Sequence, residues 1–415
     1  MPPQRTFDPE EQSRLLQNTL PLLNKEQEYV FSHIFDATIA NLTVTFFLQG
    51  AAGAGKTFVY NTLCYALRAC KLNVLCVASS GIAALLLPGG RTAHSTLKIP
   101  IDIDESSTCS VSKHSTIATT LRETNLLIWD KCSMQNRLAF EAVDRSLRDI
   151  RENNALFGGV TAVLGRDFLQ TLPVVPFSSP SDTLNAALLS SSLWLSIQPH
   201  FLKLEKNMRV GDDLSEQQFT HWQRQLARGE LNDVDDTVLI PDSLLCPNND
   251  LSSLIEFTYP HLSLPHGTDY YRERCILAPR NREAHEINDI LLDRFPGPVY
   301  DLWSVDEAMD PDNPRTPDIS FSPEVLQSAC PSNFPQAHLR LKIGCPVIVL
   351  RNLHSEEGIC NGSRGIVTRI TTRVVEILLL GGEVCLIPRI KLISADRQLP
   401  FHLHRRQFPW LSLSR

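Results

Sequence analysis

Gly50-Ala51-Ala52-Gly53-Ala54-Gly55-Lys56-Thr57 decides the fold of this chain. The stretch fits G-x-x-x-x-G-K-[ST], the phosphate-binding loop of nucleotide triphosphatases. Residues 42–48 before it have the apolar pattern of a buried strand, and residues 58–69 after it have that of an amphipathic helix. Glycines let the backbone wrap around phosphates with its N–H groups pointing inward, and the helix adds its positive end. A chance glycine-rich turn is the other interpretation, but the flanking strand and helix favour a nucleotide-binding loop.

Individual side chains around this loop have separate chemical tasks. Lys56 supplies a mobile positive charge for the β and γ phosphates, and Thr57 supplies a hydroxyl for Mg²⁺. A second Mg²⁺ residue is expected at the end of an apolar strand, where the sequence has Asp130. Taken alone, an aspartate there is also typical of a strand-end cap. The next position suits a carboxylate that accepts a proton from the attacking water, but Lys131 has no lone pair when charged.

Composition excludes several classes of protein. A chain of 415 residues is long enough for two or three domains, and no apolar run approaches the ~20 residues that span a bilayer. The first twelve residues carry Asp8, Glu10 and Glu11 and no apolar core, so we expect neither a secretory signal nor a mitochondrial presequence. The eleven cysteines form no C-x-x-C pair, which predicts reduced, mostly buried thiols in an intracellular protein and neither a zinc site nor a disulfide framework.

Charge is unevenly distributed along the chain. The formal net charge is −7, which argues against nucleic-acid binding through bulk charge. Residues 339–408, however, contain eleven Lys or Arg against five Asp or Glu. Composition leaves two interpretations of this basic segment open, a local DNA-binding groove and an ordinary solvated face.

Periodicity predicts the organisation of the chain. Strands are expected at 42–48, 73–77, 125–129, 160–164 and 201–204, with helices between several of them, such as 138–150. This alternation is typical of an α/β fold with a parallel sheet covered by helices. Further on, 275–278 predicts a strand, 282–294 a helix, and 296–331 a loop-rich stretch. Short strands follow at 346–350, 365–370, 374–380 and 383–387, separated by Asn361-Gly362 and Gly381-Gly382 turns.

A series of further motifs follows in order. They are Ala78-Ser79-Ser80-Gly81-Ile82-Ala83-Ala84, Gly89-Gly90-Arg91-Thr92-Ala93-His94-Ser95, Phe140-Glu141-Ala142-Val143-Asp144-Arg145, Leu172-Pro173-Val174-Val175-Pro176, Asn207-Met208-Arg209, Cys360-Asn361-Gly362-Ser363-Arg364 and Arg405-Arg406-Gln407-Phe408-Pro409. Together these stretches resemble the superfamily-one DNA helicases of the petite-integration-frequency type, especially the copies carried by Helitron transposons and expanded in fungi. The resemblance covers the chain from about residue 23 to 409.

The resemblance implies a role for each matched position. Gln27 resembles the residue that reads adenine, Gln170 the γ-phosphate sensor, and Arg209 an arginine that reaches the γ-phosphate. Thr92 and His94 resemble residues beside the single-strand path, although a packed or capping histidine is the default interpretation of His94 alone. The residues expected to bind the nucleotide are Gln27, Gly50, Gly53, Ala54, Gly55, Lys56 and Thr57, with Thr57 and Asp130 at Mg²⁺.

The resemblance also implies a domain plan and a biological setting. We expect a polar tail (1–20), a RecA-like ATP-binding motor domain (21–210), an acidic connecting region (211–268), the start of a second RecA-like domain (269–340), a β-rich SH3-like insert (341–395) and the end of the second motor domain (396–415). The implied activity is 5′→3′ ATP-dependent DNA unwinding in repair, recombination and telomere maintenance. The implied partners are single-stranded DNA and DNA junctions, for a nuclear monomer that does not bind membranes.

The chain departs from the family pattern in three places. Lys131 replaces a carboxylate, and Arg166 and Leu169 change a motif that reads Gly-Gly-Asp-Phe-Arg-Gln in the family. The family also continues beyond residue 409 into a further strand, a helix and a second γ-phosphate arginine, which we do not find before Arg415. We therefore expect an impaired helicase, with a catalytically dead nucleotide- and DNA-binding remnant as the alternative. An unrelated phosphate-loop enzyme, such as a small-molecule kinase, is disfavoured by the DNA-side motifs.

Overall fold

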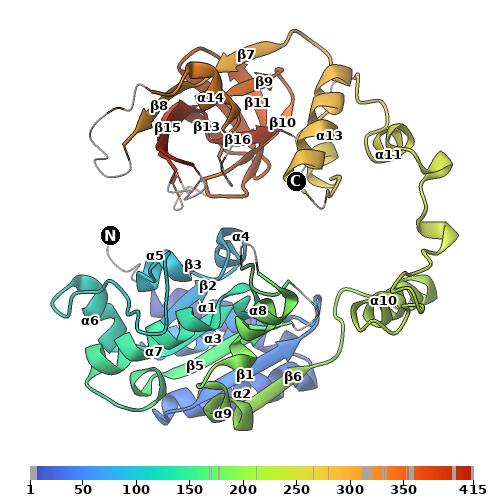
Figure 1. The fold of residues 1–415 in the computed structure, drawn as a ribbon. Coiled ribbons are helices and arrows are strands. Elements are labelled where there is room, and N and C mark those ends of the chain that lie inside the picture. Colours follow the sequence, from blue (N-terminus) through green and yellow to red (C-terminus); the bar gives the residue numbers. More distant parts are fainter. Residues whose placement is uncertain are drawn as a thin grey trace. The chain divides into compact units, whose positions relative to one another are not determined.

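The computed structural model describes residues 7–412 except 168, 170, 176–177, 212, 265, 279, 311–316, 318–319, 330, 332–333, 352, 355–358 and 395–398. The chain divides into two compact units, Met1–Leu239 and Ile240–Arg415 (Figure 1). The domain boundaries expected from the sequence within these units stay predictions. In the described part of the chain, none of the helices has the length and apolarity that crossing a membrane requires.

Unit 1 is built on a parallel sheet of six strands in the order β3-β2-β4-β5-β1-β6. The bounds are β1 Thr45–Gly50, β2 Asn73–Ala78, β3 Arg91–Thr92, β4 Thr124–Asp130, β5 Thr161–Arg166 and β6 Phe201–Leu204. Five of these strands were predicted, which confirms the α/β class with a parallel sheet. β3 has only two residues, too few for a periodic pattern to reveal.

Helices cover both faces of this sheet, because neighbouring residues of a strand point to opposite sides. In β4, Leu126 and Ile128 pack into one core with α2 and α3, whereas Leu127 and Trp129 pack into the other core with α6 and α7. Figure 1 shows these helices against the sheet. The helices of unit 1 are α1 Pro9–Thr19, α2 Lys25–Ile39, α3 Lys56–Ala69, α4 Gly81–Leu85, α5 Ala93–Leu97, α6 Thr116–Glu123, α7 Arg137–Arg151, α8 Pro180–Asn185, α9 Trp194–Ile197 and α10 Leu214–Ala227.

The expected polar tail is wrong for residues 9–19, which form helix α1. The Asp8 side chain caps the helix by accepting a hydrogen bond of 3.1 Å from the Glu10 N–H. Leu16 of α1 packs against the core that contains α3. A largely polar sequence was misleading here because a short helix needs only a narrow apolar stripe to dock.

Every strand pair of unit 2 within the described residues is antiparallel. Five strands form the order β13-β12-β11-β10-β16, three form β14-β15-β8, and two form β7-β9. The bounds are β7 Tyr300–Trp303, β8 Val305–Met309, β9 His338–Leu341, β10 Pro346–Val349, β11 Arg364–Ile370, β12 Val374–Leu379, β13 Val384–Pro388, β14 Ile390–Ile393, β15 His402–Gln407 and β16 Trp410–Ser412. The predicted turns are confirmed, with Gly362 and Gly382 at φ 93° and 95°.

The helices of unit 2 are α11 Leu251–Thr258, α12 Thr268–Arg272, α13 Asn281–Arg294 and α14 Pro323–Ser328. The predicted helix at 282–294 is confirmed as α13, but the predicted strand at 275–278 is wrong, because those residues have no regular structure. The stretch expected to be loop-rich contains β7, β8 and α14. β7 pairs with β9 and β8 pairs with β15, so the local sequence could not reveal either strand pair.

A buried ion pair connects β8 to β15. Arg405 is fully buried, and its guanidinium donates to both carboxylate oxygens of Asp306 at 2.9 and 2.8 Å. The same guanidinium donates to the backbone carbonyls of Pro335 and Leu326 at 3.0 and 2.8 Å. These bonds hold two strands, helix α14 and the loop at Pro335 around one charged group.

Candidate nucleotide and DNA site

The phosphate loop connects β1 to α3, as its sequence predicts. Gly53 and Gly55 have φ angles of 86° and 83°, which side chains rarely adopt. In addition, neither position has room for a side chain. A Cβ at Gly53 would lie 2.4 Å from Oδ1 of Asn207, and one at Gly55 would lie 2.3 Å from Nε2 of Gln27. The loop conformation therefore depends on residues far away in the sequence as well as on its own glycines.

Lys56 and Asp130 lie at the same edge of the sheet. β4, which ends at Asp130, and β1, which leads into the loop, both neighbour β5, and all three strands are parallel. The Lys56 ammonium donates to the carbonyls of Gly50 and Ala51 inside the loop. Burial lowers the pKa of Lys56, whereas the nearby carboxylates of Asp167 and Asp130 raise it. The structure thus brings the predicted phosphate-binding lysine and the predicted Mg²⁺ aspartate together.

The residues at this edge fit Mg²⁺. Burial raises the pKa of the Asp130 carboxyl, while the Lys131 backbone and the charges of Lys131 and Lys56 lower it. A buried carboxylate of this kind gains from an added cation. The Thr57 hydroxyl on the first turn of α3 would offer a second oxygen ligand, and Mg²⁺ is commonly held by one or two protein groups together with substrate phosphates. Among the described residues, no cluster of three or more His, Cys, Asp or Glu side chains suited to a metal occurs.

Gln27 supports the loop through a capping box at the start of α2. Its Oε1 accepts from the Asn24 N–H at 3.1 Å, and its backbone N–H donates to Asn24 Oδ1 at 3.0 Å. Its Nε2 donates to the carbonyl of Ala54 at 3.2 Å. The side chain is 2% exposed. Gln27 therefore contacts the phosphate loop, and its reading of adenine stays a prediction.

The segment that carries Arg209 lies against the same loop. The Met208 N–H donates to the carbonyl of Gly53 at 2.8 Å, and the Arg209 N–H donates to Asn207 Oδ1 at 2.9 Å. The Arg209 side chain is exposed, and its Cδ would lie 3.3 Å from a Cβ placed at Gly53. An exposed guanidinium beside the loop can reach a bound phosphate chain.

Asn207 and Glu26 are supporting residues that the sequence reasoning left without a role. The Asn207 side chain lies against the phosphate loop at Gly53. Glu26 Oε2 accepts hydrogen bonds from the backbone N–H groups of Glu205 and Lys206 at 2.8 and 3.1 Å. Asn207 stands in a quoted motif, which was the available signal. Glu26 adjoins Gln27 in the stretch that resembles the adenine-reading element, but its own contacts could not be predicted, because its partners are backbone groups that any sequence provides.

The two expected DNA residues lie at the sheet edge formed by β3. Thr92 ends β3 opposite Ala78 of β2, so it shares the carboxyl edge with Asp130 and the phosphate loop. The Thr92 hydroxyl donates to Ser95 Oγ at 2.8 Å, and His94 on α5 is exposed. Their contact with DNA stays a prediction.

The structure describes only part of the altered motif at the end of β5, residues 165–170. Gln170, the expected sensor, lies outside the described residues. Arg166, which stands where the family motif has a glycine, is the last residue of β5 and is 2% exposed. Lys131 has a φ of 57° and its charge lies near Lys56, whose pKa it lowers. Both departures from the family pattern are therefore at the candidate site.

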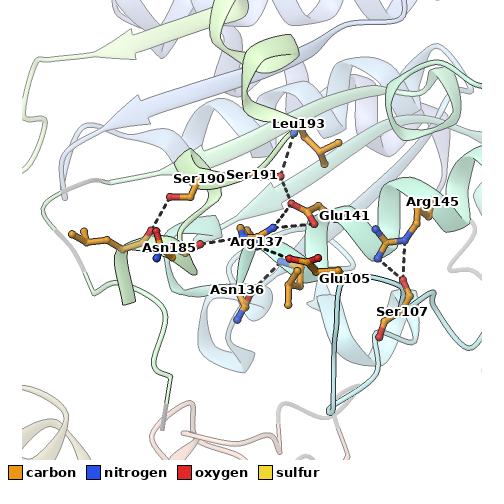
Figure 2. A network of polar contacts seen from close by, with 12 residues as sticks. Glu105, Ser107, Asn136, Arg137, Glu141, Arg145, Asn185, Ser190, Ser191 and Leu193 are labelled. Carbon is orange, nitrogen blue, oxygen red and sulfur yellow. Dashed lines mark hydrogen bonds and ion pairs between the residues drawn. The ribbon is translucent and has the colours of Figure 1, made fainter. Parts of the chain in front are cut away.

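A polar network holds the start of α7, the helix that follows Asp130 in the chain. Figure 2 shows Arg137 donating to Glu105, Glu141 and the carbonyl of Asn185. The buried Glu141 also accepts from Ser191 Oγ at 2.7 Å. The network therefore ties the start of α7 to the segment that contains Asn185 and Ser191.

Comparison with known families gives two matches. The family described as "PIF1-like helicase" matches residues 22–237, and "DNA helicase Pif1, 2B domain" matches residues 324–370. The first match covers the whole candidate site.

Individual relatives agree with this result. The chain is 37% identical over 130 residues to "ATP-dependent DNA helicase Pif1" of Psychrobacter sp., covering 31% of this chain and 20% of that protein. It is 25% identical over 353 residues to human "ATP-dependent DNA helicase PIF1", covering 85% of this chain and 47% of that protein. The chain thus spans less than half the length of these curated relatives.

A solved structure shares the fold. The Bacteroides Pif1 helicase in complex with ADP-AlF3 and ssDNA aligns with a TM-score of 0.64 at 20% identity, covering 94% of this chain and 82% of that one. At this identity the likeness concerns the fold alone.

Proposed function

Since this chain belongs to the PIF1-like helicase family, we propose that it binds ATP and DNA as an ATP-dependent DNA helicase. The observation that carries the proposal is the approach of Lys56 and Asp130 at one sheet edge, beside the Met208 backbone that contacts the loop. The finer parts of the proposal are 5′→3′ movement on single-stranded DNA, action at DNA junctions, a nuclear location and a monomeric state. DNA repair, recombination and telomere maintenance are proposed as its setting.

Each residue has a defined task in this proposal. The loop N–H groups and the Lys56 ammonium bind the β and γ phosphates, and Thr57 and Asp130 hold Mg²⁺. Mg²⁺ held by these two residues would supply charge neutralisation at the phosphates. Arg209 adds a planar charged fork at the γ-phosphate, and Gln170 senses its loss. Gln27 contacts the adenine, while Thr92 and His94 contact the DNA strand.

The lysine at position 131 determines how fast we expect this chain to hydrolyse ATP. A charged lysine accepts no proton, and it stands where the family pattern has a carboxylate. A missing general base typically costs ~10²–10⁴ in rate. We therefore propose slow hydrolysis for this chain, so that nucleotide and DNA binding without useful turnover is the second candidate function.

Nucleotide binding is tested by titrating the chain with a fluorescent ATP analogue and Mg²⁺. We expect saturable binding, and Lys56→Ala is expected to weaken it by about 10- to 100-fold, because a charge-assisted contact with phosphate is lost. Lys113→Ala is a matched control, since Lys113 lies in unit 1 and forms an exposed ion pair with Asp149. Binding that does not respond to Lys56→Ala would remove the central claim.

DNA binding is tested by fluorescence anisotropy of a labelled single strand across a salt series. We expect a modest, salt-sensitive affinity, and Arg406→Gln should reduce the slope of log K against log salt by ~0.7 if this exposed arginine contacts a phosphate. Arg272→Gln is the control, because Arg272 is exposed outside the basic segment and pairs with Asp269. Equal affinity for duplex and single strand, or no binding at low salt, would count against a helicase.

A further inference from the structure

Two buried polar atoms near the phosphate loop lack a hydrogen-bond partner within the part of the chain that the structure describes. The Tyr60 side chain on α3 is fully buried, and Asp130 at the end of β4 is 4% exposed. Among the described residues, neither the Tyr60 hydroxyl nor Oδ1 of Asp130 has a partner. Buried polar groups are paired in nearly all native structures, so two such atoms at one place call for a physical explanation.

Gly165 of β5 shows that the two atoms converge on one spot. Leu164 of β5 is opposite Trp129 of β4, so Gly165 lies beside Asp130 in the neighbouring strand. A Cβ at Gly165 would lie 1.9 Å from the Tyr60 hydroxyl oxygen and 3.0 Å from Asp130 Oδ1. The missing side chain of this glycine leaves the space that both groups face.

The chemistry of the two groups is complementary. A phenol hydroxyl is a donor at neutral pH, and an ionised carboxylate only accepts. Tyr60 also lies one helical turn after Lys56, on the same face of α3, so it comes from the helix that begins at the phosphate loop. A hydrogen bond between the two groups would join that helix to the strand that carries the predicted Mg²⁺ ligand.

We propose that Tyr60 is a positioning residue of the nucleotide site, whose hydroxyl donates a hydrogen bond to Oδ1 of Asp130. This bond fixes the carboxylate, so that its second oxygen is directed to the Mg²⁺ of a bound nucleotide. Groups that hold a metal ligand in place are needed nearly as much as the ligand itself. The inference rests on the proposed role of Asp130 at Mg²⁺.

The first test measures the affinity of the full chain for a fluorescent ATP analogue, with Mg²⁺ and with EDTA. Tyr60→Phe is expected to weaken binding about tenfold with Mg²⁺ and to leave binding in EDTA unchanged. Tyr65→Phe, a half-buried tyrosine of the same helix, is the matched control and should change neither affinity. In an Asp130→Ala background, Tyr60→Phe should cause no further loss. An equal loss with Mg²⁺ and EDTA, or independent effects of the two substitutions, would overturn the proposal.

The second test uses thermal unfolding without nucleotide or metal, so it stays informative if the chain binds no ATP. Tyr60→Phe should lower the melting temperature of unit 1 by about 2–4 °C, because a hydrogen bond to a buried charge is lost. In the Asp130→Ala background the decrease should disappear. A melting temperature that rises or stays constant would show that the hydroxyl has no partner and would reject the inference. Absence of any saturable nucleotide binding by the unmodified chain would instead reject the proposed function, whatever the unfolding data show.

Discussion

Lys131→Glu is expected to increase DNA-stimulated ATP hydrolysis by about 10²- to 10⁴-fold, because it restores a proton acceptor next to the Mg²⁺ aspartate. Lys131 directly follows Asp130, and its charge lies near Lys56. A carboxylate at this position would therefore stand beside the attacking water and the phosphates. Phosphate release is measured with and without single-stranded DNA.

The comparison needs a context in which the other catalytic groups are constant. Both versions are therefore measured on the same 415-residue chain under identical conditions. Lys131→Gln is the control, because it removes the charge without adding a base and should give no comparable increase. Robust stimulated turnover by the unmodified 415-residue chain would show that the base is elsewhere.

Asp306→Ala is expected to destabilise unit 2 by about 3–5 kcal/mol, because it leaves the guanidinium of Arg405 buried without its counter-ion. The two hydrogen bonds from Arg405 to carbonyls remain, but they do not neutralise its charge. Urea unfolding monitored by tryptophan fluorescence measures the change, and nucleotide binding reports separately on unit 1. Trp303 and Trp410 are the tryptophans of unit 2.

A matched control comes from the same unit. Glu286→Ala breaks the pair between Arg282 and Glu286 on α13, whose side chains are 89% and 59% exposed. Exposed ion pairs contribute little, so this change should hardly move the unfolding midpoint. If Asp306→Ala had an equally small effect, the buried pair would not stabilise the fold as its geometry indicates.

Local patterns predicted the parts of the fold that are local. The strands around the phosphate loop and helix α7 follow from periodicity, and the Lys56 and Asp130 positions follow from the motifs at the strand ends. Periodicity did not predict β7 and β8, whose pairing partners lie far away in the sequence. β7 pairs with β9, and β8 pairs with β15, so each is stabilised by residues that its own pattern does not contain.

At the candidate site, too, the motifs predicted individual residues but not the contacts between distant segments. The role of Asn207 against Gly53 could not be predicted, because it requires knowing that the end of β6 returns to the loop. The convergence of Tyr60 and Asp130 on Gly165 was equally invisible, since three separate elements contribute to it. Motifs identify the groups that contact the ligand, whereas the groups that support them become apparent only when the sheet is assembled.

The contacts of the phosphate loop with the segment after β6 also govern when this site can appear during synthesis. Asn24 and Met208, which meet beside the loop, are 184 residues apart in the chain. A nascent chain that has not yet released β6 from the ribosome lacks Asn207 and the Met208 backbone, so its glycines remain free to sample other conformations. ATP affinity would then arise late and abruptly during translation. Nucleotide binding by ribosome-bound chains of increasing length would reveal this step, and gradual binding by much shorter chains would refute it.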